Sequence, residues 1–359
     1  MVDQRWMTMG WIALVALGAV ACSDDDEPSN LVGLDATPYA FEEAGPWYEC
    51  PDEVFEEQGF GADVVEVEAL SSVHQYFGDD DRRTVEEVVE FPEGEWAQIG
   101  LVWELDCPEG EVCDHWDRAG SLAIAGEDGE KAVEVLRHIT PYRMGMCQFV
   151  EVTELADVLE GEQRVRSFVD TWVGPGHQEG AGWEVSARFV FFPGVDDRPR
   201  EVINIWDEHR ITVGELEEGE DVASQVEPVA FELEEGFERV EAHLTTTGHS
   251  FGNSLNCAEF CEMRHDLEVN GQVHSTLPWR SDCADNPVSP QAGTWQHNRN
   301  GWCPGAVSLG DRLDITEDVA AGENELDFDI RLANGEVYDN QSPADLLPFT
   351  RVALKLYVY

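Results

Sequence analysis

Residues 183–192, Trp-Glu-Val-Ser-Ala-Arg-Phe-Val-Phe-Phe, indicate the fold class of this 359-residue chain most directly. Apolar and polar side chains alternate along most of the stretch. Because side chains of a β-strand point alternately to opposite faces, this pattern is typical of a strand with a buried face. Similar segments recur at residues 95–105, 121–125, 133–139, 164–173, 201–206, 239–246, 265–269, 272–277, 325–332 and 351–359.

The spacing of these segments predicts an all-β protein. Asn270-Gly271 and Asn334-Gly335 are typical of type I′ hairpin turns. Long amphipathic helical patterns are absent, and residues 152–159 are expected to supply one helical turn or two. Many short strands at regular spacing favour antiparallel sandwiches. The length is natural for two domains, and residues 193–200, rich in Pro, Gly and charge, are the expected junction.

The N-terminus is expected to be an export signal. Apolar residues 7–20 lead into Ala19-Val20-Ala21-Cys22, which is similar to a bacterial lipobox with Ala19 where Leu is usual. We therefore expect residues 1–22 to be a lipoprotein signal peptide and Cys22 to carry the lipid. Ordinary secretion after A-x-A cleavage is the alternative.

An acidic linker and lead-in is expected to follow at residues 23–64. Beyond the signal, no stretch approaches the ~20 apolar residues that a membrane helix needs. The protein is thus expected to be exported and held at the bacterial cell envelope, at the outer membrane or cell surface, by its lipid.

The net charge limits the classes of partner that the protein can bind. Seventy-five Asp and Glu stand against 21 Lys and Arg, a formal net charge of −54. Such a chain repels nucleic acid and anionic lipid heads. The acids are spread along the whole length, which favours a solvated surface of a salt-adapted protein. Only carboxylates in constrained, aromatic-rich settings are therefore functional candidates.

Besides Cys22, the chain has eight cysteines, an even number that in an exported protein suggests four disulfides. They are Cys50, Cys107, Cys113, Cys147, Cys257, Cys261, Cys283 and Cys303. There are 105 ways to pair eight cysteines, and proximity favours 107 with 113 and 257 with 261. A zinc site is less well supported, because neither short loop has C-x-x-C spacing and no paired His follows.

Both short cysteine loops carry acids. The first, residues 107–113, runs directly into Asp114-His-Trp-Asp117-Arg118, and the second holds Glu259 within residues 257–261. A third segment, residues 298–305, contains Arg299, Trp302 and Cys303. Because a small disulfide loop has little freedom, an acid beside it is held as general acid–base catalysis requires. The three segments suggest one active site assembled from distant strands.

These segments resemble the peptide-N-glycosidase F family, bacterial amidases that remove N-linked glycans from glycoproteins. The similarity extends over roughly residues 65–358 and rests on four motifs in the family's order, at residues 113–118, 138–142, 257–261 and 301–305. The resemblance implies two eight-stranded antiparallel jelly rolls side by side, with the active site in the cleft between them. The expected domains are then residues 65–195 and 196–359.

The resemblance also implies roles for individual residues. Asp117 matches the essential catalytic aspartate, Glu259 the second acid near a bridging water, and Asp170 a Glu that assists catalysis. The matching substrate-binding positions are Arg118, Trp172, Arg299 and Trp302. The implied disulfides are 107–113, 257–261 and 283–303, which leaves Cys50 and Cys147 to pair with each other. No metal or cofactor is implied.

The implied reaction is hydrolysis of the amide between an Asn side chain and N-acetylglucosamine by carboxylate-activated water, with N-linked glycoproteins or glycopeptides as substrates. Two departures, Asp170 for Glu and Phe260 for Trp, motivate an alternative: a non-catalytic, glycan-binding lipoprotein of the same fold. A third hypothesis is a copper monooxygenase, which shares the tandem jelly rolls. It would need His clusters and a Met ligand, whereas the ten His of the chain include no His-His or His-x-His pair.

Overall fold

The computed structural model describes residues 36, 39–41, 47–51, 60–126, 131–195, 197–217, 220–342 and 348–359. The expected signal peptide (1–22), the lipid-bearing Cys22 and most of the linker lie outside them. Within them, no helix is both long enough and apolar enough to cross a membrane.

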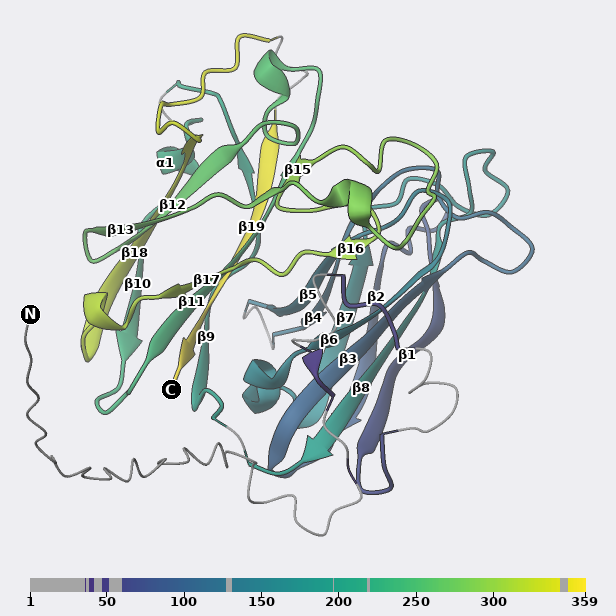
Figure 1. Cartoon of the computed structure of the whole chain (residues 1–359), viewed down its shortest axis with the longest axis horizontal. Helices are drawn as coiled ribbons and strands as arrows, with labels where there is room; N and C mark the ends of the chain where they lie inside the picture. Colours follow the sequence, from purple (N-terminus) through teal and green to yellow (C-terminus); the bar gives the residue numbers. More distant parts are fainter. Residues whose placement is uncertain are drawn as a thin grey trace, which may run out of the picture.

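The first sandwich consists of two antiparallel sheets packed face to face (Figure 1). One sheet has the order β1 (Val65–Gln75), β8 (Trp183–Pro193), β3 (Trp96–Asp106) and β6 (Met146–Glu151). The other has the order β5 (Val133–Ile139), β4 (Ala119–Ile124), β7 (Gly161–Val169) and β2 (Thr84–Phe91). Fully buried Trp103, Trp183 and Phe189 belong to the core between the sheets.

The second sandwich repeats this plan. One sheet has the order β17 (Asp311–Asp314), β11 (Val240–His249), β19 (Phe349–Val358) and β9 (Glu201–Thr212). The other has the order β10 (Val229–Leu233), β18 (Gly322–Leu332), β12 (Met263–Val269) and β13 (Gln272–Thr276). Buried Leu244, Leu267 and Phe328 belong to its core. Each sandwich thus has eight main strands, which confirms the predicted pair of antiparallel jelly rolls.

Helices are few and short in the described part of the chain. They are α1 (Val222–Gln225) and the 3-10 turns η3 (Thr153–Val158), η4 (Ser254–Asn256), η5 (Cys283–Asp285) and η6 (Thr316–Asp318). The short helical segment predicted at 152–159 is η3.

The two predicted Asn-Gly turns differ. Asn270 and Gly271 have φ values of +47° and +85°, and they join β12 to β13 as a type I′ hairpin requires. At the other site only Gly335 has a positive φ. No strand is assigned directly after it in the described chain, so the second prediction was wrong.

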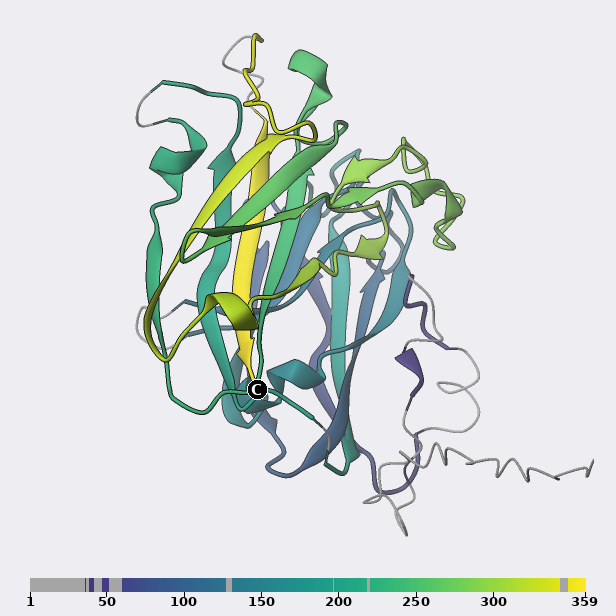
Figure 2. The same cartoon turned by 60° about the vertical axis from the view of Figure 1, so that its left-hand side comes forward.

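A bridging segment, residues 279–307, links the sandwiches (Figure 2). Its first two strands, β14 (Trp279–Arg280) and β15 (Arg299–Asn300), pair with each other, with Arg280 opposite Arg299. Its last strand, β16 (Ala306–Val307), leaves the second half of the chain and pairs with β5 of the first sandwich. The segment therefore places residues of the second half against the first sandwich.

All four implied disulfides are present: Cys50–Cys147, Cys107–Cys113, Cys257–Cys261 and Cys283–Cys303. The first ties the lead-in to β6, where Phe41 and Phe60 pack against Phe149. This packing buries the outer face of β8 as well as its inner face, so the alternation seen in residues 183–192 ends in a continuous buried run. The domain division between residues 195 and 196 stays a prediction, although the chain passes from the first sandwich to the second between Pro193 and Glu201.

Candidate active site

The turn before β4 sets the position of Asp117. Fully buried Asp114 accepts hydrogen bonds from the Trp116 backbone N–H (3.0 Å), Arg118 Nε (2.7 Å) and Thr171 Oγ1 (2.7 Å). The Cys107–Cys113 disulfide closes the loop immediately before this turn. The backbone around Asp117 is therefore held from both sides.

Asp117 is largely buried and has two close polar neighbours. Its Oδ2 accepts a hydrogen bond from the Tyr142 hydroxyl at 2.6 Å and lies 3.4 Å from Arg299 Nη2. Burial raises the pKa of Asp117 above its ordinary value, and the Arg299 charge and the Tyr142 hydrogen bond partly oppose that rise. Tyr142 OH also lies 3.2 Å from Thr294 Oγ1, so a second polar contact helps to fix the hydroxyl.

Glu259 comes from the loop that follows β11 in the second sandwich, closed by Cys257–Cys261. The loop lies directly on Gly248, where a Cβ would overlap the Ala258 carbonyl. Asn300 N–H donates to the Glu259 backbone carbonyl at 2.9 Å. The side chain is only 11% exposed. Burial, and then the nearby Asp117 charge, raise the pKa of Glu259 to about 7.

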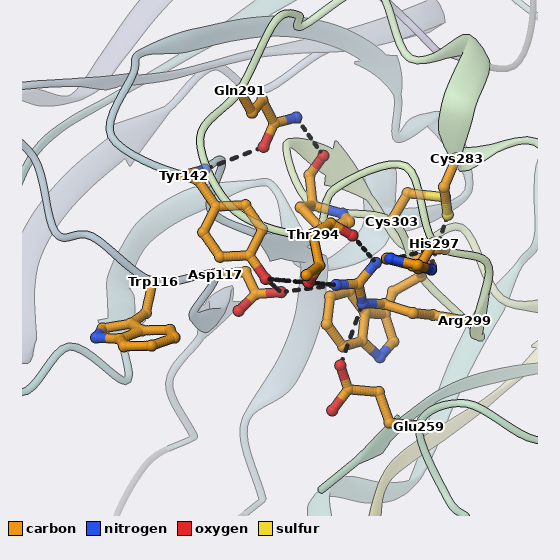
Figure 3. Close-up of polar contacts among 12 residues, drawn as sticks. Trp116, Asp117, Tyr142, Glu259, Cys283, Gln291, Thr294, His297, Arg299 and Cys303 are labelled. Carbon is orange, nitrogen blue, oxygen red and sulfur yellow. Dashed lines mark hydrogen bonds and ion pairs between the residues drawn. A yellow bond between two sulfur atoms is a disulfide. The ribbon is translucent and has the colours of Figure 1, made fainter. Parts of the chain in front are cut away.

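Arg299 joins the two acids (Figure 3). Its Nε lies 3.2 Å from Glu259 Oε1, while Nη2 lies 3.4 Å from Asp117 Oδ2. Its other contacts are with Thr294 Oγ1 (3.1 Å), the Thr294 carbonyl (3.2 Å), the His297 carbonyl (2.6 Å) and Tyr142 OH (3.4 Å). The side chain is completely buried. A planar guanidinium with five donors suits this task, because it can hold two carboxylates in one plane.

Two aromatic rings flank the Arg299 guanidinium. Its Cζ lies 4.9 Å from the centre of the Phe260 ring and 4.7 Å from that of Trp302. Trp302 is 3% exposed and donates its indole N–H to the Gly248 carbonyl at 2.7 Å. It packs against Ala119 and Ile139 of the first sandwich. Trp302 is therefore a buried wall of the site rather than an open stacking platform.

These residues border a cleft of about 650 Å³, within the size range of ordinary small-molecule sites. Side chains from both sandwiches and from the bridging segment line it. They are Trp116, Asp117, Tyr142, His249, Ser250, Phe251, Asn256, Glu259, Phe260, Thr294, His297, Trp302 and Phe349. Trp116 and Phe251 are 49% and 66% exposed, so open aromatic faces meet the solvent here.

Of the predicted site residues, the structure brings together Asp117, Glu259, Arg299 and Trp302. The other three do not line this cleft. They are Arg118, Asp170 and Trp172. Arg118 instead forms a 2.7 Å ion pair with Asp114.

Asp170 belongs to a separate charged cluster. It pairs with Arg351 of the second sandwich at 2.7 Å and lies 3.7 Å from Arg83. The Arg83 guanidinium lies over the neighbouring rings of Phe77 (4.7 Å) and Trp172 (4.4 Å). Asp170 and Trp172 are thus near each other, as their sequence spacing requires, but in a cluster that links the two sandwiches.

Sequence reasoning missed several residues of the site. Tyr142 and Trp116 stand inside two of the family motifs, so a signal existed and no role was drawn from it. Thr294, His297 and Phe251 lie in irregular loops where no periodicity or spacing marks them. In the described chain, no group of three or more His, Cys, Asp or Glu is arranged to hold a metal ion.

Known proteins are similar to this chain in sequence. The family model described as "Peptide-N-glycosidase F, C terminal" matches residues 219–344. The peptide-N(4)-(N-acetyl-beta-D-glucosaminyl)asparagine amidase F of Elizabethkingia miricola is 23% identical over 276 residues, which cover 72% of this chain and 75% of that protein.

Solved structures show the same fold. PNGase F from Flavobacterium meningosepticum, a glycosylasparaginase, superposes with a TM-score of 0.69 at 20% identity, covering 83% of this chain and 96% of that one. A structure of PNGF-II gives a TM-score of 0.64 at 16% identity, covering 82% and 65%. The matched family model and the curated relative make the chain similar to peptide-N-glycosidase F in sequence, and the solved structures show that it shares the double jelly-roll fold.

Proposed function

We propose that this protein is a peptide-N4-(N-acetyl-β-glucosaminyl)asparagine amidase, which hydrolyses the amide between an Asn side chain and the first N-acetylglucosamine of an N-linked glycan. Its similarity to peptide-N-glycosidase F supports a peptide-N-glycosidase-like function. The observation that carries the finer proposal is the pair Asp117 and Glu259. One acid comes from each sandwich, and Arg299 holds both beside the cleft.

Asp117 acts as the general base. The hydrogen bonds from Tyr142 and Arg299 favour its ionised form. It takes a proton from a water molecule while the water oxygen forms a bond to the side-chain carbonyl carbon of the substrate Asn. Proton transfer of this kind typically contributes about 10²–10⁴-fold to a rate.

Glu259 acts as the general acid. With a pKa of about 7, it carries a proton in a substantial fraction of molecules near neutral pH. It gives this proton to the glycosyl nitrogen as the C–N bond breaks. One water is consumed, and the products are an aspartyl side chain and a glycosylamine.

Arg299 fixes the positions of the two acids relative to each other. Its donors are engaged by Glu259, Asp117 and the Thr294–His297 loop. It is therefore better suited to positioning the carboxylates than to binding a developing oxyanion. Arg118 is engaged by Asp114 in the same way. The exposed ring of Trp116 offers an apolar face for the C–H groups of a sugar.

The test is incubation of the purified protein with a denatured N-glycoprotein, read by mass spectrometry of the glycosylated peptide. We expect Asn to become Asp at that site, with release of the intact glycan. Asp117→Asn should abolish release, whereas Asp157→Asn, at an exposed acid outside the cleft, should not. Full activity in folded Asp117→Asn protein would overturn the assignment.

A non-catalytic glycan-binding protein is the second candidate. It is supported by the engagement of Asp170 with Arg351 and Arg83, which leaves this residue outside the cleft lining. Glycan binding by wild-type protein, without release after prolonged incubation, would favour this candidate over the amidase.

For localisation, we propose that the protein is exported and lipid-anchored through Cys22 at the cell envelope. The four disulfides support an oxidising compartment. Metabolic labelling with a fatty acid should mark the wild-type protein and not Cys22→Ser. Equal labelling of both would contradict lipid attachment at this residue.

A further inference from the structure

A second cavity, of about 290 Å³, lies beside the two-stranded ladder of the bridging segment. It shares no lining residue with the candidate active site. The ladder separates them, because Arg299 of β15 reaches the two acids whereas Arg280, its partner on β14, lines the second cavity. Gly301 lines the second cavity and its neighbour Trp302 lines the active-site cleft.

The floor of the second cavity holds an unsatisfied polar group. Thr246 is 2% exposed, and its hydroxyl has no hydrogen-bond partner among the described residues. Most buried polar atoms are paired, since leaving one unpaired costs about 1–3 kcal/mol. Gly301, at φ +87°, allows the close approach here, because a Cβ would overlap the Thr246 carbonyl. The floor is thus tightly built around a hydroxyl that lacks a partner.

The walls of the second cavity combine an ion pair with an aromatic ring. Arg280 Nε and Nη2 donate to the two oxygens of Asp282 at 2.8 and 2.9 Å. The ring of Trp47, from the lead-in, lies 4.8 Å from the Arg280 guanidinium and helps to fix it. Trp279 is half-buried and lines the same cavity. The cavity is therefore lined by the flat indole of Trp279 and by the hydrogen-bonded pair Arg280–Asp282.

Asp311 supplies a further carboxylate, and the rim is apolar. Leu277 and Leu309 are 54% and 41% exposed at the mouth of the cavity. Large apolar side chains at the edge of a concave site with convergent polar groups are typical of small-molecule binding. The volume of about 290 Å³ is just below the usual range of about 300–1,000 Å³, so a ligand of one ring fits better than a larger one.

We propose that this cavity binds one pyranose ring of a neutral saccharide. The C–H face of the sugar packs on Trp279. Its hydroxyls hydrogen-bond with the Thr246 hydroxyl and the carboxylates of Asp282 and Asp311, since a hydroxyl both donates and accepts.

Other ligand classes fit less well. An anion would meet two carboxylates and one guanidinium in a protein of net charge −54. A purely apolar ligand would leave Thr246 unpaired. The inference rests on this cavity alone and not on the amidase reaction, so the two can fail independently.

The test is binding of single sugars to the full chain by saturation-transfer NMR, with N-acetylglucosamine, methyl mannoside and galactose as separate probes. We expect at least one probe to bind wild-type protein, and Trp279→Ala and Thr246→Val each to weaken its binding about tenfold. Thr246→Val conserves shape and removes an unpaired hydroxyl, so it should fold as well as wild type. Thermal unfolding checks this.

Trp116→Ala is the matched control, because it removes an exposed indole from the active-site cleft instead. Binding in the second cavity should persist in this variant. Loss of sugar binding in Trp116→Ala, with retention in Trp279→Ala and Thr246→Val, would assign all binding to the cleft and overturn the proposal. Failure of all three sugars to bind folded wild-type protein would overturn it too.

Discussion

The Tyr142 hydroxyl donates a 2.6 Å hydrogen bond to Asp117 Oδ2. Tyr142 follows β5 and Asp117 precedes β4, so two neighbouring strands of one sheet deliver the donor and the acceptor. The contact is internal to the first sandwich, whereas Arg299 reaches the same oxygen from the bridging segment. Asp117 Oδ2 is thus contacted from the first sandwich and from the bridging segment, and the two contacting groups, Tyr142 OH and Arg299 Nη2, also lie 3.4 Å from each other.

Tyr142→Phe is predicted to raise the pKa of Asp117, because the hydrogen bond it removes lowers that pKa. A hydrogen bond to a charged group is worth about 1.5–3 kcal/mol. The acidic limb of the profile of kcat/KM against pH should move to higher pH. Tyr357→Phe, which removes a buried hydroxyl outside the cleft lining, should leave the limb in place. Identical shifts in both variants would contradict a specific role for Tyr142.

Glu259→Gln is predicted to change how the free energy of unfolding depends on pH. The folded-state pKa of about 7 exceeds the ordinary 4.5, so the folded protein binds the proton more tightly. This contribution to stability is complete below pH 4.5 and is lost as pH rises to about 7. At 1.36 kcal/mol per pH unit, the loss is on the order of 3 kcal/mol.

Urea denaturation of wild type and Glu259→Gln at acidic and mildly alkaline pH measures this difference. The variant should gain stability relative to wild type on going to the higher pH. Parallel pH profiles for the two proteins would show that Glu259 titrates near its ordinary value.

Gly301→Ala is predicted to lower both stability and activity. At φ +87° an L-residue costs roughly 1–2 kcal/mol, and the new Cβ would also overlap the Thr246 carbonyl. Relief of that overlap shifts the chain between Arg299 and Trp302. Gly271→Ala is the matched control, since it has φ +85° with nothing near its Cβ. It should lose stability only through strain and keep its activity, so equal effects in both variants would contradict the contact argument.

Asp170→Asn is predicted to lower stability while leaving the chemistry intact. It weakens a 2.7 Å ion pair with Arg351 that joins the two sandwiches, at a cost of about 1 kcal/mol for a partly exposed pair. Steady-state kcat/KM should stay within about threefold of wild type. Asp81→Asn, at the more exposed partner of Arg83, should change neither quantity. A fall of about 100-fold in kcat at unchanged stability would restore a catalytic role for Asp170.

Much of the fold could be predicted from local patterns. The alternation in β8 and in the segments like it identified strands, and Asn270-Gly271 identified a hairpin, because both signals arise from backbone geometry within a few residues. Asn334-Gly335 carries the same dipeptide, yet Asn334 does not take the positive φ that the turn needs. The two sites differ in their strand partners, because β13 begins directly after Gly271 and pairs with β12, whereas no strand begins directly after Gly335 in the described chain.

The site residues that the sequence predicted are those whose positions are fixed within a single short motif. Asp117 and Glu259 each follow from a short disulfide loop, and Arg299 and Trp302 from the bridging segment. The contacts that join these residues were not predictable, because they link positions as far apart as Asp117 and Arg299, which are separated by 182 residues in the sequence. Arg118 belongs to the first motif and Asp170 matches a family Glu, but Asp114 and Arg351 engage their charges instead.

By itself, the sequence determined the strand pattern, the acids held by disulfide loops and the family to which these motifs point. Each depends on residues close together in the chain. Only the tertiary structure decided which acids share one cation, how far each pKa departs from its ordinary value, and that Thr246 and Trp279 meet in a second cavity. Burial and charge–charge distance control these properties, and both arise when the bridging segment packs between the two sandwiches.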